Sequence, residues 1–382
     1  MTALLALGAG AVPPLIIALE TGDHERQYQA AIVLGRLRDD RACMPLMVAL
    51  GSTDAHVRSG AAYALGELGD GGAVPALIVA LGDPDRVVRR LSAQALGKLK
   101  DGSAVTPLIA AFRTEQSGRE AHREIAEALA ALGDMAVLPL IDALRDPDSA
   151  VRAGAAVALG RLGDLRALLP LIHAFQNAFQ NAFQKKEQAV KGDIDALCSM
   201  VAALGSLGDP RAVEPMIEKL TDPGCSWEVR CHLASVLSRM GDTRAVAPLI
   251  ALLTQDDEDS DARCFAATAL GRLGDGRAVT PLISCLQHQD NGWDLRSRTA
   301  TALGELGDQR AVDPLRDALE DSDRRVRQVA ARALRSLESQ RADSGRPEKV
   351  RADDFARRDD PPFPVVRHLY VLCNRFVVRL RL

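Results

Sequence analysis

The sequence contains few aromatic residues: they make up 3% of its 382 residues, whereas apolar residues as a whole make up 47%. A core with so few large rings must be built mainly from alanine, leucine and valine. Such a core favours closely packed helices over sheets, because strands prefer β-branched and aromatic side chains. The composition therefore predicts an all-α protein.

The chain also lacks an excess of charge, since 47 Lys and Arg stand against 51 Asp and Glu, for a net charge of −4. This balance gives no electrostatic reason to bind nucleic acid, and we expect none among the partners. The seven cysteines form no C-x-x-C pair, which indicates a reduced, cytoplasmic protein rather than a disulfide framework. Nucleophile–base, P-loop and zinc-binding spacings are missing too. We therefore expect no catalytic residue, metal or cofactor.

Residues 1–19 carry no charge and are about long enough to cross a bilayer. They lack the basic start of a signal peptide, and Pro13 and Pro14 interrupt the segment. The repeat pattern described next also explains these residues. We therefore favour a soluble protein over an exported or membrane-bound one.

A proline recurs at nearly constant intervals along most of the chain. Consecutive prolines of this column lie 30 to 33 residues apart, except for one interval of 45 between Pro170 and Pro215. The column consists of Pro14, Pro45, Pro75 (displaced by one residue), Pro107, Pro139, Pro170, Pro215, Pro248, Pro281 and Pro314. Such self-similarity is typical of a solenoid. It predicts about ten repeats in residues 1–337, with the sixth, at about 163–208, enlarged by an insert at 174–188.

Each repeat has the pattern of two helices. The first carries the proline near its start, where the missing N–H costs least. An aspartate column precedes the second helix and is suited to cap it: Asp23, Asp54, Asp85, Asp148, Asp193, Asp259 and Asp323. Four residues later comes an arginine column, which predicts charge-assisted bonds between neighbouring repeats or, alternatively, anion binding: Arg58, Arg89, Arg152, Arg230, Arg263, Arg296 and Arg327.

A column of small residues lies near the end of the second helix: Gly35, Gly66, Gly97, Ala130, Gly160, Gly205, Ser238, Gly271 and Gly304. Glycine inside a helix costs about 1 kcal/mol. Its recurrence predicts that the neighbouring second helix approaches closely.

Together these features resemble the HEAT-like repeats first associated with phycocyanobilin (PBS) lyases, over roughly residues 8–337. The resemblance implies an α-α superhelix, or solenoid, of HEAT-like helix pairs. The resemblance also suggests two enzyme classes with which the chain can be compared. Deoxyhypusine hydroxylases, which resemble HEAT arrays, bind two irons through His-Glu pairs, but this chain has a single such pair, His24-Glu25, so no iron site carries over. Bilin lyases are often two-subunit arrays, yet no catalytic residue can be matched.

The two ends of the array leave alternatives open. The apolar residues 2–7 either dock on another subunit or fold back as a cap. Residues 338–364 are charged and contain prolines, which predicts a disordered linker. Residues 365–382 form a basic apolar tail that could pack on the array, lie on a membrane, bind a partner or be an accident of the reading frame.

The insert contains AFQNAFQNAFQK, which repeats one tetrad three times. A step of four residues advances a helix by about 400°, so Phe175, Phe179 and Phe183 form one stripe on an extended first helix. We favour a stripe covered by the second helix of the same repeat, which would run from about Lys186. The alternatives are an exposed ridge that binds a partner and a neutral expansion without a selected role.

Trp227 and Trp293 both stand three residues before the column arginine. They either pack against the turn between the helices or anchor a partner, because tryptophan is enriched in binding hot spots. We predict a protein-protein interaction scaffold that binds a protein on its concave face, lined by second helices, or on its rim. The candidate anchors are Phe179, Phe183, Trp227 and Trp293. The alternative is a bilin lyase or chaperone-like lyase subunit, followed by a deoxyhypusine hydroxylase-like enzyme.

Overall fold

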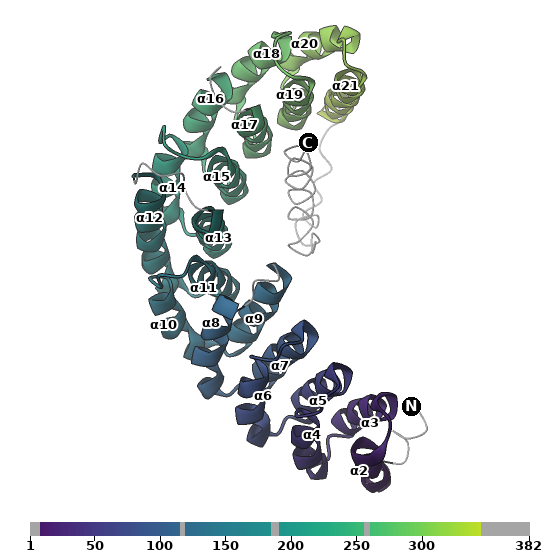
Figure 1. Ribbon diagram of the computed structural model, residues 1–382. Coiled ribbons are helices and arrows are strands. Elements are labelled where there is room, and N and C mark those ends of the chain that lie inside the picture. The colour runs from purple at the N-terminus through teal and green to yellow at the C-terminus, as the bar shows by residue number, and fades with distance from the viewer. Residues whose placement is uncertain (1–7, 115–118, 185–190, 256–259, 345–382) are drawn as a thin grey trace, which may run out of the picture. The chain divides into compact units, whose positions relative to one another are not determined.

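The computed structural model describes residues 8–114, 119–184, 191–255 and 260–344. Within these ranges every regular element is a helix, and no strand occurs. The chain divides into two units, Met1–Leu337 and Glu338–Leu382. The first unit confirms the predicted all-α array of ten helix pairs (Figure 1).

The first helices of the pairs carry even numbers and the second helices carry odd numbers. The first helices are α2 (Val12–Thr21), α4 (Cys43–Ala49), α6 (Val74–Ala80), α8 (Val105–Thr114), α10 (Asp134–Ala143), α12 (Leu168–Gln184), α14 (Val213–Leu220), α16 (Val246–Thr254), α18 (Val279–Gln287) and α20 (Val312–Asp317). The second helices are α3 (His24–Leu37), α5 (Ala55–Leu68), α7 (Arg86–Leu99), α9 (Arg119–Ala131), α11 (Ser149–Leu162), α13 (Lys191–Leu207), α15 (Trp227–Met240), α17 (Ser260–Leu273), α19 (Trp293–Leu306) and α21 (Arg324–Ser344).

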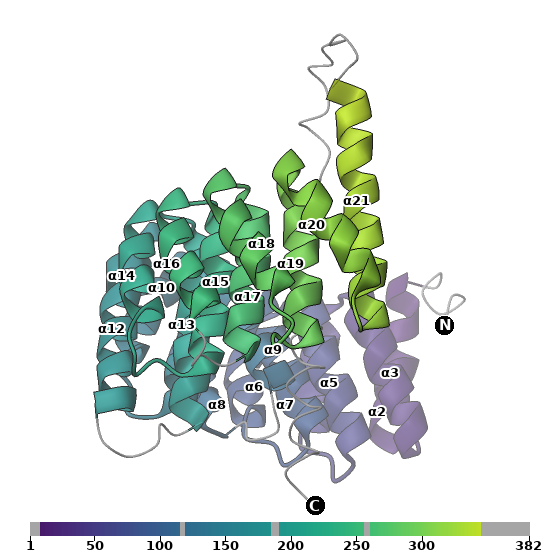
Figure 2. The same ribbon diagram turned by 90° about the horizontal axis from the view of Figure 1, so that it is seen from above.

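The helices of the first unit form two layers. From α3 to α19, each second helix packs against its own first helix, and those from α3 to α17 pack against the second helix of the next repeat. Gly304 of α19 lies against Ala333 of α21. Consecutive pairs lie side by side, as both ribbon views show (Figures 1 and 2). We call the layer of odd-numbered helices the second-helix layer.

The aspartate column caps second helices as predicted. Asp54, for example, accepts a hydrogen bond from Val57 N at 3.1 Å, and Asp148 accepts one from Ala150 N at 2.8 Å. Asp23, Asp85 and Asp323 act in the same way. The prediction is wrong for Asp193, because α13 begins at Lys191 and places this aspartate within its first turn. Asp259 lies outside the described residues.

A second kind of turn joins one repeat to the next. The second helix ends in a left-handed residue, usually glycine, such as Gly69 with φ 83° or Gly307 with φ 71°. An aspartate then caps a short 3₁₀ helix that leads into the next first helix. This two-part end explains why the Gly-Asp dipeptide recurs at the repeat boundary.

The small-residue column lets neighbouring second helices touch backbone to backbone. A Cβ atom added at Gly97 would lie 2.8 Å from Ala128 Cα, and one at Gly66 would lie 2.8 Å from Ala95 Cα. Gly35, Gly160, Gly271 and Gly304 make the same kind of contact with an alanine of the next second helix. The predicted close approach is therefore confirmed, and it makes this layer tightly spaced.

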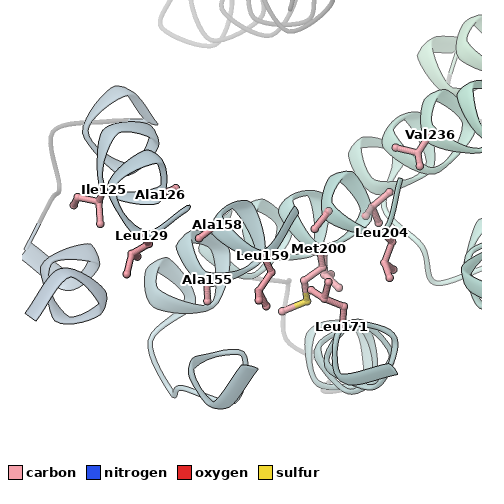
Figure 3. Packing of buried hydrophobic residues seen from close by; sticks show 14 of the residues in the cluster. Ile125, Ala126, Leu129, Ala155, Ala158, Leu159, Leu171, Met200, Leu204 and Val236 are labelled. Carbon is pink, nitrogen blue, oxygen red and sulfur yellow. The ribbon is translucent and has the colours of Figure 1, made fainter. Parts of the chain in front are cut away.

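Leucine and methionine fill the space between the layers. Leu159 of α11, Leu171 of α12 and Met200 of α13 are all fully buried. Figure 3 shows Leu171 beside Met200, where the first helix of the enlarged repeat meets its second helix. The aromatic-poor core expected from the composition is thus an alanine and leucine core with a few rings at special places.

The ends of the array lie partly outside the described residues. Residues 2–7 and the tail at 365–382 are among those not described, so the predictions made for them stay predictions. Helix α21 continues to Ser344. The predicted linker at 338–364 therefore begins as helix rather than as disordered chain.

Candidate functional site

The arginine column binds the turn inside its own repeat and often the next repeat as well. Arg58 donates through Nη1 to Ser52 O at 2.9 Å and through Nε to Asp83 Oδ2 at 2.7 Å. Arg296 repeats this arrangement with Asp321, whose Oδ2 lies 2.8 Å from Arg296 Nε. Bonds between neighbouring repeats are thus confirmed. Their acceptor in these two cases lies two residues before the aspartate column.

The pair formed by Arg296 and Asp321 is buried. Their side chains are only 6% and 3% exposed. Burial by itself would raise the pKa of Asp321, but the hydrogen bonds from Arg296 and from Asp323 N outweigh it and leave that pKa lowered. The pair is therefore an ionised structural clasp between repeats.

Other members of the column hold the same turn with different groups. Arg152 donates to Asp193 at 2.5 Å, so the displaced column aspartate still serves the neighbouring repeat. Arg263 Nε donates to Leu253 O at 3.0 Å, ten residues back. In the fourth repeat, His122 stands at the arginine position and its Nε2 contacts Phe112 O at 3.1 Å, also ten residues back. The described members of the arginine column therefore have a structural role.

The phenylalanine stripe of the insert is largely covered. Phe175 is fully buried and Phe179 is 3% exposed, whereas Phe183 is half-buried. The ring centroids of Phe179 and Phe183 lie 4.7 Å apart. The exposed-ridge alternative therefore does not describe Phe179, which offers no surface to a partner.

The cover comes from the following repeat as well as from the same one. Helix α12 packs against α13 as favoured above. The described part of α13 runs from Lys191, and the predicted start near Lys186 lies outside the described residues. The ammonium group of Lys219, on α14, lies 5.2 Å from the ring centroid of Phe179. The Lys219 side chain is itself only 9% exposed. Along its described part, the extended helix α12 and its phenylalanine stripe therefore pack against neighbouring helices.

Trp227 and Trp293 are the first residues of α15 and α19 and are 36% and 40% exposed. They therefore lie at equivalent places on one edge of the second-helix layer. The Arg325 guanidinium lies 3.2 Å from the ring centroid of Trp293, so the next repeat covers one face of that ring. Both rings combine local packing with an accessible surface.

The residue directly after the small-residue column shows a charge pattern that was not predicted from the sequence. In the early repeats opposite charges face each other there, as Lys98 Nζ donates to Glu67 Oε1 at 2.6 Å. In the seventh and eighth repeats the same position holds Arg239 and Arg272, side by side on packed helices. Aligning the repeats by their glycines would have found this pair.

The first-helix layer exposes apolar side chains in its early repeats. Ile17, Val48 and Val79, on α2, α4 and α6, are 59%, 72% and 80% exposed. They occupy one position of three consecutive repeats, whereas Glu218 and Asp317 occupy it later in the chain. The two ends of this layer therefore differ in polarity.

The described residues offer no metal centre, because they contain no group of three or more His, Cys, Asp and Glu side chains that could hold an ion. His24 instead lies 3.1 Å from Asp54 through Nδ1, and Glu25 lies 3.8 Å from His56. The His-Glu pair thus links the first two repeats. None of the described helices is long and apolar enough to span a membrane.

The sequence profile of HEAT repeats matches residues 12–78, 65–122, 119–182, 186–263 and 253–335. These segments cover most of the chain, which therefore belongs to the HEAT-repeat family. The match is to HEAT repeats in general, and the narrower resemblance to the lyase repeats is not shown by it. None of the curated proteins matches the chain.

Solved structures share the fold at low sequence identity. Kap121p is 12% identical, with a TM-score of 0.57, and the match covers 86% of this chain but 42% of Kap121p. The complex of CpcE and CpcF of phycocyanin lyase from Nostoc sp. PCC7120 is 23% identical over 76% of this chain and 93% of that one, with a TM-score of 0.33. Human deoxyhypusine hydroxylase is 20% identical over 78% and 97%, with a TM-score of 0.31. The likeness to Kap121p concerns the fold alone, and the likenesses to the other two structures carry no argument.

Proposed function

We propose that the protein is an interaction scaffold, which binds a partner protein on the second-helix layer or on the edge where Trp227 and Trp293 stand. The observation that carries this proposal is the exposure of those two tryptophans at equivalent positions. A partly exposed tryptophan supplies a large amphipathic surface at low conformational cost and is enriched in binding hot spots. Phe183 is half-buried and remains a weaker candidate anchor.

The test is affinity capture from source-cell lysate with Trp227→Ala/Trp293→Ala beside the wild type. The matched control is Met44→Ala/Leu169→Ala, which removes two large side chains that are 65% and 53% exposed on the other layer. We expect the tryptophan variant to lose at least tenfold of a partner that the control retains, at equal folded concentration. Trp293→Phe separates anchoring from packing, because it keeps a ring beneath Arg325.

Equal capture of the partner by all variants would show that the tryptophans are not part of the interface. Failure to capture any specific partner would contradict the scaffold function itself. A bilin lyase subunit remains the competing function, on the basis of repeat resemblance alone. Co-expression with a bilin source separates the two, because a lyase would yield a phycobiliprotein with visible absorbance. Docking of the apolar residues 2–7 on a second subunit and a cytoplasmic location also remain proposals.

A further inference from the structure

The first three helices of the even-numbered layer share one exposed apolar surface. Ile17 of α2, Val48 of α4 and Val79 of α6 are 59%, 72% and 80% exposed. Helix α2 contacts α4, and α4 contacts the 3₁₀ helix that leads into α6, so the three helices lie in series (Figure 1). Four residues earlier on each helix, and therefore on the same side of it, stands another exposed apolar residue: Pro13, Met44 and Pro75. We call these six residues the apolar face.

No charged side chain interrupts the apolar face within these three described helices. Helices α4 and α6 contain no charged residue, and α2 has only Glu20, next to its last residue. Gly51 and Gly82 stand just after α4 and α6, at the position that Arg113 and Arg145 occupy in the next two repeats. Long polar side chains therefore do not overhang the apolar face, as they do farther along the layer.

The area of the apolar face is sufficient for a dimer. Full burial of one aliphatic side chain removes roughly 100 Å² from water, so the six together expose on the order of 500 Å². This lies in the upper range of the largest patch on a monomer, which is about 300–600 Å². Two such faces would bury about 1,000 Å², the threshold for a specific interface, before any polar rim is counted. Proline, valine and isoleucine also lose little side-chain entropy when an interface orders them.

The order of residue types across the apolar face suits a second copy of this chain. Helices α2 and α6 flank α4, and each carries a proline followed four residues later by a β-branched residue, Ile17 or Val79. A two-fold axis through α4 therefore places α2 of one copy against α6 of the other, and like residues meet. Such self-complementarity is what an interface between identical subunits requires.

Two other occupants fit the apolar face less well. The tail at residues 365–382 carries four arginines and no acidic residue, whereas the three helices offer only Glu20 as a counter-charge. A membrane surface favours an apolar face flanked by lysine and arginine, and α2, α4 and α6 contain neither. Charge therefore favours a second, equally uncharged face.

We propose that the apolar face is the interface of a homodimer, with a two-fold axis through α4. This inference does not depend on the scaffold function, because Trp227 and Trp293 belong to the second-helix layer. The dimer would present two copies of that layer and could hold a repetitive partner at two places. Met44→Ala leaves an apolar side chain in the face, so it does not test the dimer and still serves as a control for the tryptophans.

Sedimentation equilibrium of the full chain, from about 1 to about 100 µM, tests the proposal. The variant is Val48→Glu/Val79→Glu, which places two carboxylates in the face of each copy. The control is Ala251→Glu/Ser284→Glu, which makes the same change in charge at the equivalent exposed positions of α16 and α18. Circular dichroism and the melting temperature show whether each variant is folded.

We expect the wild type to sediment with twice the chain mass of 40.8 kDa and a micromolar dissociation constant. The face variant should dimerise at least a hundredfold more weakly, and the control should stay within about twofold of the wild type. Glutamate at positions that are 72% and 80% exposed should leave the monomer folded.

A mixture of two single variants tests the two-fold arrangement. Ile17→Lys and Val79→Glu each place a charge against an apolar residue of an identical copy, so each should dimerise weakly alone. In the mixture the new lysine of one chain faces the new glutamate of the other across the axis. We expect the mixture to dimerise at least tenfold more tightly than either variant alone.

Four results would overturn the proposal. These are a wild type that stays monomeric at about 100 µM, a folded face variant that dimerises as well as the wild type, a control that loses the dimer equally, and a mixture that shows no gain. A monomeric wild type destabilised by Val48→Glu/Val79→Glu but not by the control would have its face covered by its own chain. A monomer that floats with phosphatidylcholine vesicles would instead use the face on a membrane.

Discussion

Two turns of this molecule use the same residue types for different purposes. The turn before a second helix can hold an Arg–Asp pair with the preceding repeat, such as Arg296–Asp321, with side chains 6% and 3% exposed. Between repeats, the turn before the 3₁₀ helix holds pairs such as Arg277–Asp275, with side chains 59% and 18% exposed. The closest N–O distances are nearly equal, 2.8 and 2.7 Å. The N–O distance alone therefore says little about how much each pair contributes to the stability of the fold.

The two pairs differ in their exposure to solvent and in how far apart their residues lie along the chain. Arg277 and Asp275 are neighbours along the chain, so their bond mainly shapes one loop, and water competes for it. Arg296 and Asp321 belong to successive repeats and are shielded from water, so their bond connects two structural units. We expect the pair at the intra-repeat turn to stabilise the packing of successive repeats. We expect the pair at the boundary turn to fix only the conformation of its own loop.

The largest expected effect is that of Arg296→Met, which leaves Asp321 buried without its cation. Breaking a buried pair in this way typically costs about 3–5 kcal/mol. Urea unfolding followed by circular dichroism measures the loss. Arg277→Met is the control at the exposed turn, and equal losses in both variants would erase the distinction between the turns.

A second substitution at the partner should restore part of that stability. In Arg296→Met/Asp321→Asn the buried charge is gone, and the asparagine oxygen can still accept from Asp323 N, as Asp321 Oδ1 does at 2.8 Å. We expect at least half of the loss to be recovered in the same unfolding experiment. No recovery would mean that contacts other than the charge pair hold this turn.

Acid should weaken the bonds made by the aspartates of the boundary turns. Hydrogen bonds from Arg211 and Arg277 lower the pKa of Asp209 and Asp275 to about 2. Since the folded pKa lies below the unfolded value of 3.8, their contribution is complete above about pH 4 and is lost as the pH falls toward 2. Scanning calorimetry from pH 5 to pH 2 should show a falling melting temperature, with a shallower fall for Asp209→Asn/Asp275→Asn. A curve that is flat for the wild type would contradict these bonds.

The smallest effect is expected for Arg277→Gln. The arginine is exposed, and its aspartate keeps the bond from the backbone of residue 277 at 2.9 Å. We expect no measurable change in the denaturation midpoint. A shift comparable to that of Arg296→Met would show that boundary turns also connect repeats, through the contact of Arg277 Nη2 with Thr243 O at 3.3 Å.

Much of the fold could be predicted because repetition makes its local causes visible. Prolines, capping aspartates and glycines recur at fixed places, and each has a local physical role. The acceptor of Arg296 was not predictable in the same way, since Asp321 lies outside the aspartate column and its role depends on how two turns meet. The cover over Phe179 likewise depends on Lys219 of the next repeat, which helical periodicity does not locate.

The candidate site was predicted less well than the fold. Trp227 and Trp293 were found from their spacing to the column arginine, and they lie at the expected edge. The pair of Lys98 and Glu67 was missed because each residue alone is an ordinary surface charge. Such a pair is recognised only when neighbouring repeats are compared at one position.

The contacts of the glycine column have a mechanical consequence. Where Gly97 lies against Ala128 and Gly66 lies against Ala95, backbone already meets backbone. Hard repulsion between such atoms rises steeply with compression, whereas separating them forfeits only weak dispersion contacts. Neighbouring second helices therefore resist compression much more strongly than separation. A load that presses them together meets a rigid limit, and a load that tilts them apart meets only a soft restoring force.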